Sequence, residues 1–198
     1  MLNIGIILGS VRAGSLGETI LDYWQKQTPN TADVTYHWLK LRDFPLEPYH
    51  HDETPLSQRI QGLQENESLW LETLAKMDGF VFVSPEYDHA LTGAFKNALD
   101  YVGPETDHKP VQIVTYSSYS DGGMLAAANM VGILQMLQMI VLPTPVLLWN
   151  AGDNFATDGT LKDHPNSAHF ANRLAEATHD ITFYSQLLKD HPYEPINH

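Results

Sequence analysis

Short continuous apolar runs alternate along this chain with longer segments whose apolar residues recur at helical spacing. Residues 2–8 form the first apolar run, which ends at Gly9. A run of this kind is typical of a central parallel strand that is buried on both faces. Further strand-like runs cover residues 34–41, 80–83, 111–116 and 141–148, and the two prolines in the last run place it at the edge of the sheet.

The segments between these runs predict helices over residues 15–27, 54–76, 93–102, 122–140 and 165–189. Residues 43–55 contain three prolines and are expected to form a long loop. Residues 122–140 are apolar on nearly every side of the predicted helix. This pattern indicates a helix that is covered by the sheet on one side and by a partner subunit on the other.

Five strands that alternate with helices predict an α/β fold with a doubly wound parallel sheet and right-handed crossovers. The 198 residues fit a single domain spanning 1–198, and no repeat or low-complexity tract divides them. In such folds, ligands bind beyond the carboxyl ends of the strands, where the strand order reverses. The residues that follow each strand are therefore the candidates for function.

The composition narrows the function classes. The chain has 43% apolar and 10% aromatic residues, enough to fill a sizeable core, and it has no cysteine. Disulfides, thiolate zinc sites, cysteine-ligated iron–sulfur clusters and cysteine nucleophiles are thereby excluded. The formal net charge of −13 repels the phosphates of nucleic acids and anionic lipids, so we expect neither nucleic acid nor a membrane as a partner.

The sequence also bears on location. Residues 1–8 lack the basic region and the small-residue cleavage site of a secretory signal. The longest apolar stretch, residues 130–149, contains two glutamines and two prolines, and it is expected to be a buried helix followed by a strand. We therefore expect a cytoplasmic protein.

The segment after the first predicted strand, residues 9–18, has the chemistry of a phosphate site. It combines small residues with the hydroxyls of Ser10 and Ser15 and the guanidinium of Arg12, at the start of a helix whose dipole favours anions. It carries neither a Walker loop nor a dinucleotide fingerprint. The alternative is a helix cap at Ser15 with a surface arginine nearby.

Two other segments follow the third and fourth predicted strands. In residues 84–93, Pro85 stiffens the strand exit and Tyr87 offers a flat face, although an ordinary turn has the same composition. In residues 117–123, Gly122 and Gly123 can present backbone N–H groups to a ligand, or can form a flexible turn. The predicted topology brings all three segments to one edge of the sheet, where they could hold a phosphorylated planar ring.

These segments resemble the NADPH-dependent FMN reductase family. The resemblance runs from about residue 2 to residue 146, and its most specific stretch is SPEYDHALTGAFKNALD at residues 84–100. The family pattern there is Pro-Glu-Tyr-Asn followed by Gly-x-Leu-Lys-Asn-Ala-Ile-Asp. The sequences GSVR at 9–12 and LRDFPL at 41–46 also fit. The resemblance implies a flavodoxin-like three-layer α/β/α sandwich with a five-stranded parallel sheet in the order 2-1-3-4-5.

The resemblance also implies a set of FMN-binding residues. By resemblance, the phosphate would be held by Ser10, Arg12, Ser15 and Gly17. The isoalloxazine ring would be lined by Pro85, Glu86, Tyr87 and Asp88. The ribityl chain and the pyrimidine edge would be contacted by Ser117, Ser118, Gly122 and Gly123. Members of the family are typically dimers or tetramers, which suits the apolar helix predicted at 122–140.

The chain departs from the family pattern at four positions. Asp88 stands in place of the usual asparagine, and Thr92 in place of a proline. Tyr119 stands where glycine is usual, and Leu125 where arginine is frequent. These changes leave flavin binding expected and put the identity of the substrate in doubt.

The expected activity is that of an FMN-dependent NAD(P)H oxidoreductase. It would pass hydride from NADPH or NADH through FMN to a small acceptor, such as a flavin, a quinone or an azo compound, by a ping-pong mechanism, and no side chain need act as a catalytic base. One alternative is a flavodoxin-type electron carrier without NAD(P)H turnover, which the net charge of −13 favours and the Arg12 loop disfavours. The other alternative is a non-catalytic flavodoxin-like binding module, which Tyr119 in the flavin position would favour.

The chain has ten histidines, and its densest group of metal-binding side chains is the run His50-His51-Asp52-Glu53. Adjacent histidines in a proline-rich loop rarely converge on one ion without further ligands. The sequence therefore predicts no metal site, and we expect this run to form a wall of the acceptor pocket.

Overall fold

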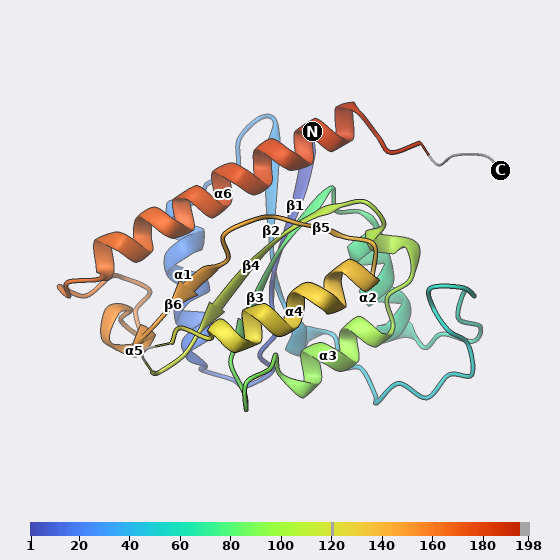
Figure 1. Cartoon of the computed structure of the whole chain (residues 1–198), viewed down its shortest axis with the longest axis horizontal. Coiled ribbons are helices and arrows are strands. Elements are labelled where there is room, and N and C mark those ends of the chain that lie inside the picture. Colours follow the sequence, from blue (N-terminus) through green and yellow to red (C-terminus); the bar gives the residue numbers. More distant parts are fainter. Residues whose placement is uncertain (120, 195–198) are drawn as a thin grey trace.

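The structure is a computed structural model that describes residues 1–119 and 121–194. Its helices are α1 (Leu16–Gln27), α2 (Glu65–Ala75), α3 (Gly93–Asp100), α4 (Met124–Met136), α5 (Ala151–Asn154) and α6 (Ser167–Asp190). Its strands are β1 (Leu2–Leu8), β2 (Val34–Lys40), β3 (Gly79–Pro85), β4 (Pro110–Tyr116), β5 (Ile140–Val141) and β6 (Val146–Leu148). Figure 1 shows these elements along the chain.

The strands form one parallel sheet in the order β2-β1-β3-β4-β5, with β6 also paired to β4. This confirms the predicted order 2-1-3-4-5. The predicted last strand is split in two, because the segment between β5 and β6 contains Pro143 and Pro145, which cannot donate ladder hydrogen bonds. β5 and β6 then pair in turn with the two ends of β4.

Two apolar cores flank the sheet. Side chains of β1 such as Ile4 and Ile6 pack with Trp24 of α1 and Phe170 of α6, all nearly inaccessible to solvent. On the opposite face, α2, α3 and α4 cover the sheet in a second core around Phe82. The result is the expected three-layer α/β/α arrangement.

The predicted helix over residues 54–76 is wrong in its first half. The helix α2 begins at Glu65, and residues 54–64 are irregular. Gly62 adopts a left-handed φ of 68°, and Gln64 starts the helix through a capping box with Glu67. The apolar residues that suggested a longer helix, Leu56 and Leu63, pack against the core from this loop instead.

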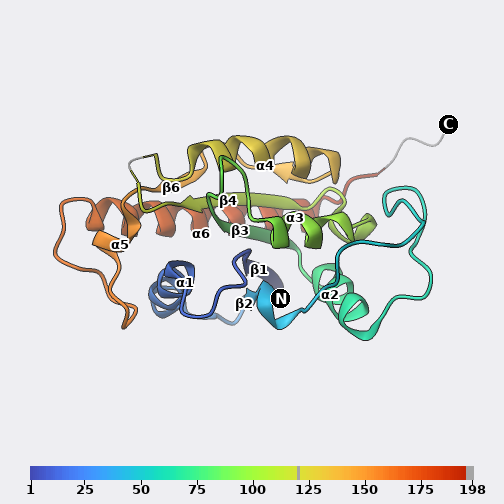
Figure 2. The same ribbon diagram turned by 90° about the horizontal axis from the view of Figure 1, so that it is seen from below.

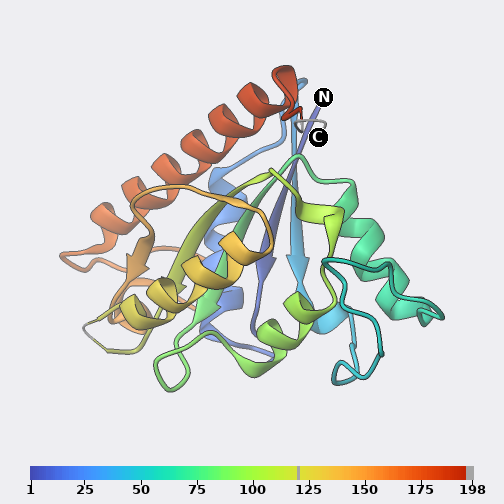
Figure 3. The same ribbon diagram turned by 45° about the vertical axis from the view of Figure 1, so that its right-hand side comes forward.

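The loops after β1 (residues 9–15), after β3 (residues 86–92) and after β4 (residues 117–119 and 121–123) lie at the same end of the sheet, the lower end in Figures 1 and 3. Figure 2 looks onto this end. We call these segments the β1, β3 and β4 loops. Within the described residues, no helix has the length and apolar character needed to span a bilayer.

Candidate functional site

A cleft of about 180 Å³ lies where the β1, β3 and β4 loops meet. It is lined by Ser10, Arg12, Ser15, Leu16, Pro85, Glu86, Tyr87, Tyr116, Ser117, Ser118 and Tyr119. A larger groove of about 670 Å³ runs beside α6, but its lining residues carry none of the predicted phosphate or ring contacts. The cleft at the loops is therefore the candidate site.

Thr92 joins the β1 loop to α3 and helps to fix the geometry of the site. Its hydroxyl donates to the carbonyl oxygen of Gly9 at 2.7 Å and accepts the N–H of Phe95 at 3.1 Å, as the cap of α3. Gly9 has no room for a side chain, since a Cβ there would lie 2.1 Å from the ring of Phe95. The β1 loop is thus pressed directly onto the start of α3.

Arg12 supplies the positive charge of the cleft. Its guanidinium contacts the hydroxyl of Tyr87, and this hydrogen bond raises the pKa of Arg12. Within the described part of the chain, Arg12 forms no ion pair with a carboxylate, whereas Arg42 and Arg173 each pair with one or more. An exposed guanidinium that has no acidic partner can bind an anion.

Side chains of the protein already accept hydrogen bonds from backbone N–H groups at the start of α1. The hydroxyl of Ser15 accepts the N–H of Glu18, and the carboxylate of Glu18 accepts the N–H of Gly14 at 2.7 Å. Glu18 also pairs with Arg42 at 2.5 Å and with Lys40 at 3.5 Å. An anion in the cleft would therefore meet hydroxyls and the guanidinium rather than a bare helix end.

Tyr116, the last residue of β4, forms the floor of the cleft and was not predicted. Its side chain is buried, and burial raises the pKa of its hydroxyl, which is hydrogen-bonded to Ser10 and to the N–H of Gly17. Gly17 is required here, because a Cβ would lie 2.3 Å from the Tyr116 oxygen. The sequence did carry a signal, since Tyr116 is the last residue of the strand predicted at 111–116 and ligands bind beyond the carboxyl ends of the strands.

Glu86 connects the β3 loop to α4. Its carboxylate accepts the N–H of Ala126, in the first turn of α4, at 3.0 Å, and its other oxygen lies 3.3 Å from His89. A carboxylate at this position satisfies a free backbone donor and complements the helix dipole. The Glu86 side chain therefore holds two parts of the site together.

Asp88 lies at the tip of a tight turn. Tyr87 and Ala90 form a bridge, and the two residues between them have left-handed φ values, 48° at Asp88 and 68° at His89. This is the arrangement of a two-residue hairpin turn, in which Asn, Asp and Gly are preferred. Asp88 is exposed and does not line the cleft.

The β4 loop is ordered by its own hydrogen bonds. The hydroxyl of Ser117 lies 2.7 Å from the carboxylate of Asp121, which also accepts the N–H of Gly123 at 3.2 Å. These bonds lower the pKa of Asp121. Both Gly122 and Gly123 have left-handed φ values, 64° and 82°, and pack against the β4 and β6 backbones.

The structure thus gathers most of the predicted site residues in one cleft. Those that line it are Ser10, Arg12, Ser15, Pro85, Glu86, Tyr87, Ser117 and Ser118. Gly17 contacts the hydroxyl of Tyr116, Asp88 lies at the turn tip, and Gly122 and Gly123 lie in the β4 loop against β4 and β6, outside the lining of the cleft. Leu16 and Tyr116 are additional lining residues, as is Tyr119, whose ring is 78% exposed. Ser120 lies outside the described residues.

Comparisons with known proteins agree with this arrangement. The sequence profile of the NADPH-dependent FMN reductase family matches residues 2–154. An NAD(P)H-dependent FMN reductase of Schizosaccharomyces pombe is 29% identical over 187 residues, which cover 94% of this chain and 90% of that protein. A quinone reductase of Escherichia coli K12 is 30% identical over 148 residues, which cover 73% of this chain and 75% of that one.

The fold has a close counterpart among solved structures. FerB, a flavoenzyme NAD(P)H:(acceptor) oxidoreductase from Paracoccus denitrificans, superimposes with a TM-score of 0.74 at 20% identity. The superposition covers 93% of this chain and 99% of that protein.

Proposed function

The chain belongs to the NADPH-dependent FMN reductase family, and we propose that it binds FMN in the cleft between the β1, β3 and β4 loops and reduces a small organic acceptor at the expense of NADPH or NADH. The acceptor class is a flavin, a quinone, an azo compound or a similar small molecule. The observation that carries the proposal is Arg12, which lies in the cleft with Ser10 and Tyr87 and forms no ion pair with a carboxylate of the described residues.

The side chains that the β1 loop contributes to the cleft suit a phosphate. Arg12 offers a charge-assisted donor, and Ser10 and Ser15 offer hydroxyls within the same short loop. In our proposal these residues hold the phosphate of FMN, while Gly17 allows Tyr116 to pack closely beneath the loop.

The side chains that the β3 and β4 loops contribute to the cleft suit a flat ring. Pro85 and Tyr87 provide apolar and aromatic surface, and Ser117 and Ser118 provide polar groups. The cleft, at about 180 Å³, is smaller than the roughly 300–1,000 Å³ typical of a site that encloses a whole ligand. The phosphate end would therefore be held inside, and the ring would extend over the open side between Tyr87 and the β4 loop.

When bound, FMN supplies the hydride chemistry, and the protein supplies binding, orientation and electrostatics. Arg12 and the hydroxyls fix one end of the ligand, and Glu86 holds the β3 loop against α4. No side chain has to act as a general base. Donor and acceptor would use the same open face in turn, which gives a ping-pong order.

Replacement of Arg12 tests the site. We expect Arg12→Ala to raise the dissociation constant for FMN, measured by fluorescence titration of flavin-free protein, without changing its thermal midpoint. The matched control is Arg59→Ala, since Arg59 is an exposed arginine that does not line the cleft. Equal FMN affinities for Arg12→Ala, Arg59→Ala and the natural chain would place the flavin elsewhere.

Steady-state kinetics test the activity and its order. NADPH oxidation should depend on both FMN and an added quinone or flavin, and parallel lines in double-reciprocal plots would support the ping-pong order. Electron transfer to a protein partner without NADPH or NADH turnover would favour a carrier instead.

The proposal also includes a homodimer or homotetramer and a cytoplasmic location, both of which stay predictions. α4 exposes Met124 and Leu125 at its start and Met136 at its end, with exposed fractions of 53%, 42% and 69%. A partner subunit that packs along α4 would cover these apolar side chains. Sedimentation would measure the assembly, and cell fractionation would measure the location.

A further inference from the structure

The long loop after β2, residues 41–64, is hydrogen-bonded to α3. Asn97 of α3 accepts the N–H of Tyr49 at 2.8 Å and donates to the carbonyl oxygen of Glu47 at 2.9 Å. The hydroxyl of Tyr101 also donates to Glu47, at 2.9 Å. The loop therefore presents its next residues, His50 and His51, from a fixed position.

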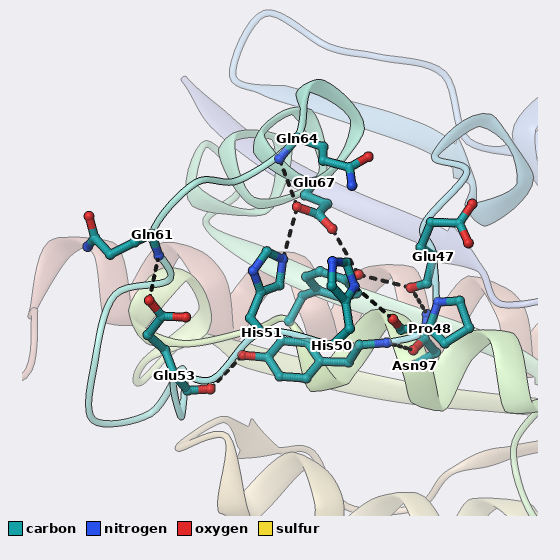
Figure 4. A network of polar contacts seen from close by, with 11 residues as sticks. Glu47, Pro48, His50, His51, Glu53, Gln61, Gln64, Glu67 and Asn97 are labelled. Carbon is teal, nitrogen blue, oxygen red and sulfur yellow. Dashed lines mark hydrogen bonds and ion pairs between the residues drawn. The ribbon is translucent and has the colours of Figure 1, made fainter.

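These two histidines face a buried carboxylate of α2 (Figure 4). The rings of His50 and His51 stack with centroids 4.7 Å apart, and Nε2 of His51 lies 3.1 Å from Oε2 of Glu67. One donor atom from each of the three residues can be chosen such that all lie within 4.8 Å of one another. Nδ1 of His50 lies 3.1 Å from the carbonyl oxygen of Pro48, and Nε2 of His50 has no hydrogen-bond partner among the residues that the structure describes.

Glu67 is held in place by hydrogen bonds. Its side chain is only 2% exposed. Its carboxylate accepts the N–H of Gln64 at 2.8 Å and the hydroxyl of Tyr101 at 3.0 Å, and it lies 3.1 Å from Nε2 of His51. In metal sites, hydrogen bonds of this kind hold a ligating carboxylate in its orientation.

We propose that His50, His51 and Glu67 form a binding site for Zn²⁺ or a similar divalent transition metal, with Nε2 of both histidines and Oε2 of Glu67 as ligands. A water molecule would complete the coordination on the exposed side of His50. The metal would lie between Nε2 of His51 and Oε2 of Glu67 in place of the hydrogen bond that joins them, and the proton of that bond would pass to solvent. Nothing in the proposed flavin chemistry requires this metal.

The donor set selects the class of metal. Two imidazole nitrogens and one carboxylate oxygen suit zinc, whereas calcium and magnesium prefer oxygen ligands alone. Ligand atoms about 2.0–2.2 Å from a tetrahedral zinc are separated from one another by about 3.4 Å. The separation of 3.1 Å between His51 and Glu67 is already close to that value, and the exposed ring of His50 can move to complete the set.

The sequence predicted no metal here because the adjacent histidines had no further ligand. The structure supplies that ligand from α2, sixteen residues beyond His51. Tyr101, the residue that follows α3, supports Glu67 with a hydroxyl 3.0 Å from its other carboxylate oxygen. Metal binding would thus link the loop after β2 to two helices.

Zinc titration of chelator-treated protein tests the proposal. We expect isothermal titration to give one saturable site per chain whose affinity falls by at least about 10–100-fold in His50→Ala and in His51→Ala, because even residues behind a ligand change metal affinity by that factor. The control is His191→Ala, an exposed histidine at the end of α6, which should bind as tightly as the natural chain. Unchanged affinity in both His50→Ala and His51→Ala, or no saturable binding at all, would overturn the site.

A second measurement distinguishes a metal at this place from zinc bound elsewhere. Arg59 is exposed in the chain between His51 and Glu67, so a metal that bridges the two ends of this segment should slow trypsin cleavage after Arg59. We expect zinc to slow this cleavage in the natural chain and in His191→Ala, and to leave it unchanged in His50→Ala. Cleavage that zinc slows equally in all three proteins would contradict the proposal.

Discussion

The link between Glu86 and α4 gives the sharpest test of how the site is built. The Glu86 side chain is only 7% exposed, and its carboxylate accepts the N–H of Ala126 at 3.0 Å. Glu86→Ala leaves that donor without a partner, at a cost of about 1–2 kcal/mol by comparison with lost helix caps and unsatisfied buried groups. In a domain of this size, about 1 kcal/mol shifts the thermal midpoint by roughly 2–4 °C. We therefore expect the midpoint to fall by about 2–8 °C.

Glu86→Gln separates the hydrogen bond from the charge. Glutamine keeps an acceptor oxygen and loses only the charge–dipole interaction of about 0.3–1 kcal/mol. The expected loss is therefore below about 4 °C and smaller than that of Glu86→Ala.

The assay is thermal unfolding of the flavin-free protein, followed by far-ultraviolet circular dichroism. The control is Glu72→Ala, since Glu72 is an exposed glutamate of α2 and its loss should stay within about 0.5 kcal/mol. If Glu86→Ala unfolds at the same temperature as the natural chain, the carboxylate does not cap α4 and the reasoning fails.

Three further predictions follow from the same geometry. Gly9→Ala should destabilise the protein by about 1–3 kcal/mol in urea unfolding, because its Cβ would lie 2.1 Å from the ring of Phe95; an unchanged urea midpoint would show that the β1 loop does not press on α3. Asp88→Asn should keep the turn, which has a left-handed φ of 48°, and should raise the midpoint potential of bound flavin in a redox titration by removing a negative charge; a lowered or unchanged potential would count against it. The pKa of Asp121 is lowered, chiefly by the hydrogen bond from Ser117. The ionised carboxylate therefore stabilises the fold above the usual pKa of 3.8, and this stabilisation is lost as the pH falls through the lower pKa of the folded state. As the pH is lowered below 4, the free energy of unfolding of Asp121→Asn should therefore fall less than that of the natural chain. Identical profiles of unfolding free energy against pH would contradict this assignment.

The fold was predictable wherever one periodicity dominated. The strand at residues 2–8 was predicted with the bounds of β1, because a short, mostly apolar run that ends at a glycine is typical of a buried parallel strand. The first half of the helix predicted over 54–76 was wrong because Leu56 and Leu63 reach the core from an irregular loop. In such a loop, the spacing of apolar residues along the sequence does not indicate a helix. Its true start depends on the capping box at Gln64, a local signal that the apolar pattern concealed.

The loops that form the site were predictable, whereas the side-chain contacts that hold these loops in place were less so. The rule that ligands bind at strand ends located Arg12 and Tyr87 in one cleft. It could not show that Glu86 turns its carboxylate to α4, nor that Glu67 meets two histidines from a distant loop. Contacts of that kind depend on how helices pack on the sheet, which spacing along the chain does not encode.

The central claim is that three loops at one end of the sheet hold FMN where a nicotinamide donor can reach it. The most direct measurement is the visible absorption spectrum of the purified chain, reconstituted with FMN and freed of unbound flavin, before and after anaerobic addition of NADPH. We predict that flavin absorption stays with the protein and is bleached by NADPH. A protein that retains no flavin, or whose flavin absorption is unchanged by either NADPH or NADH, would contradict the account.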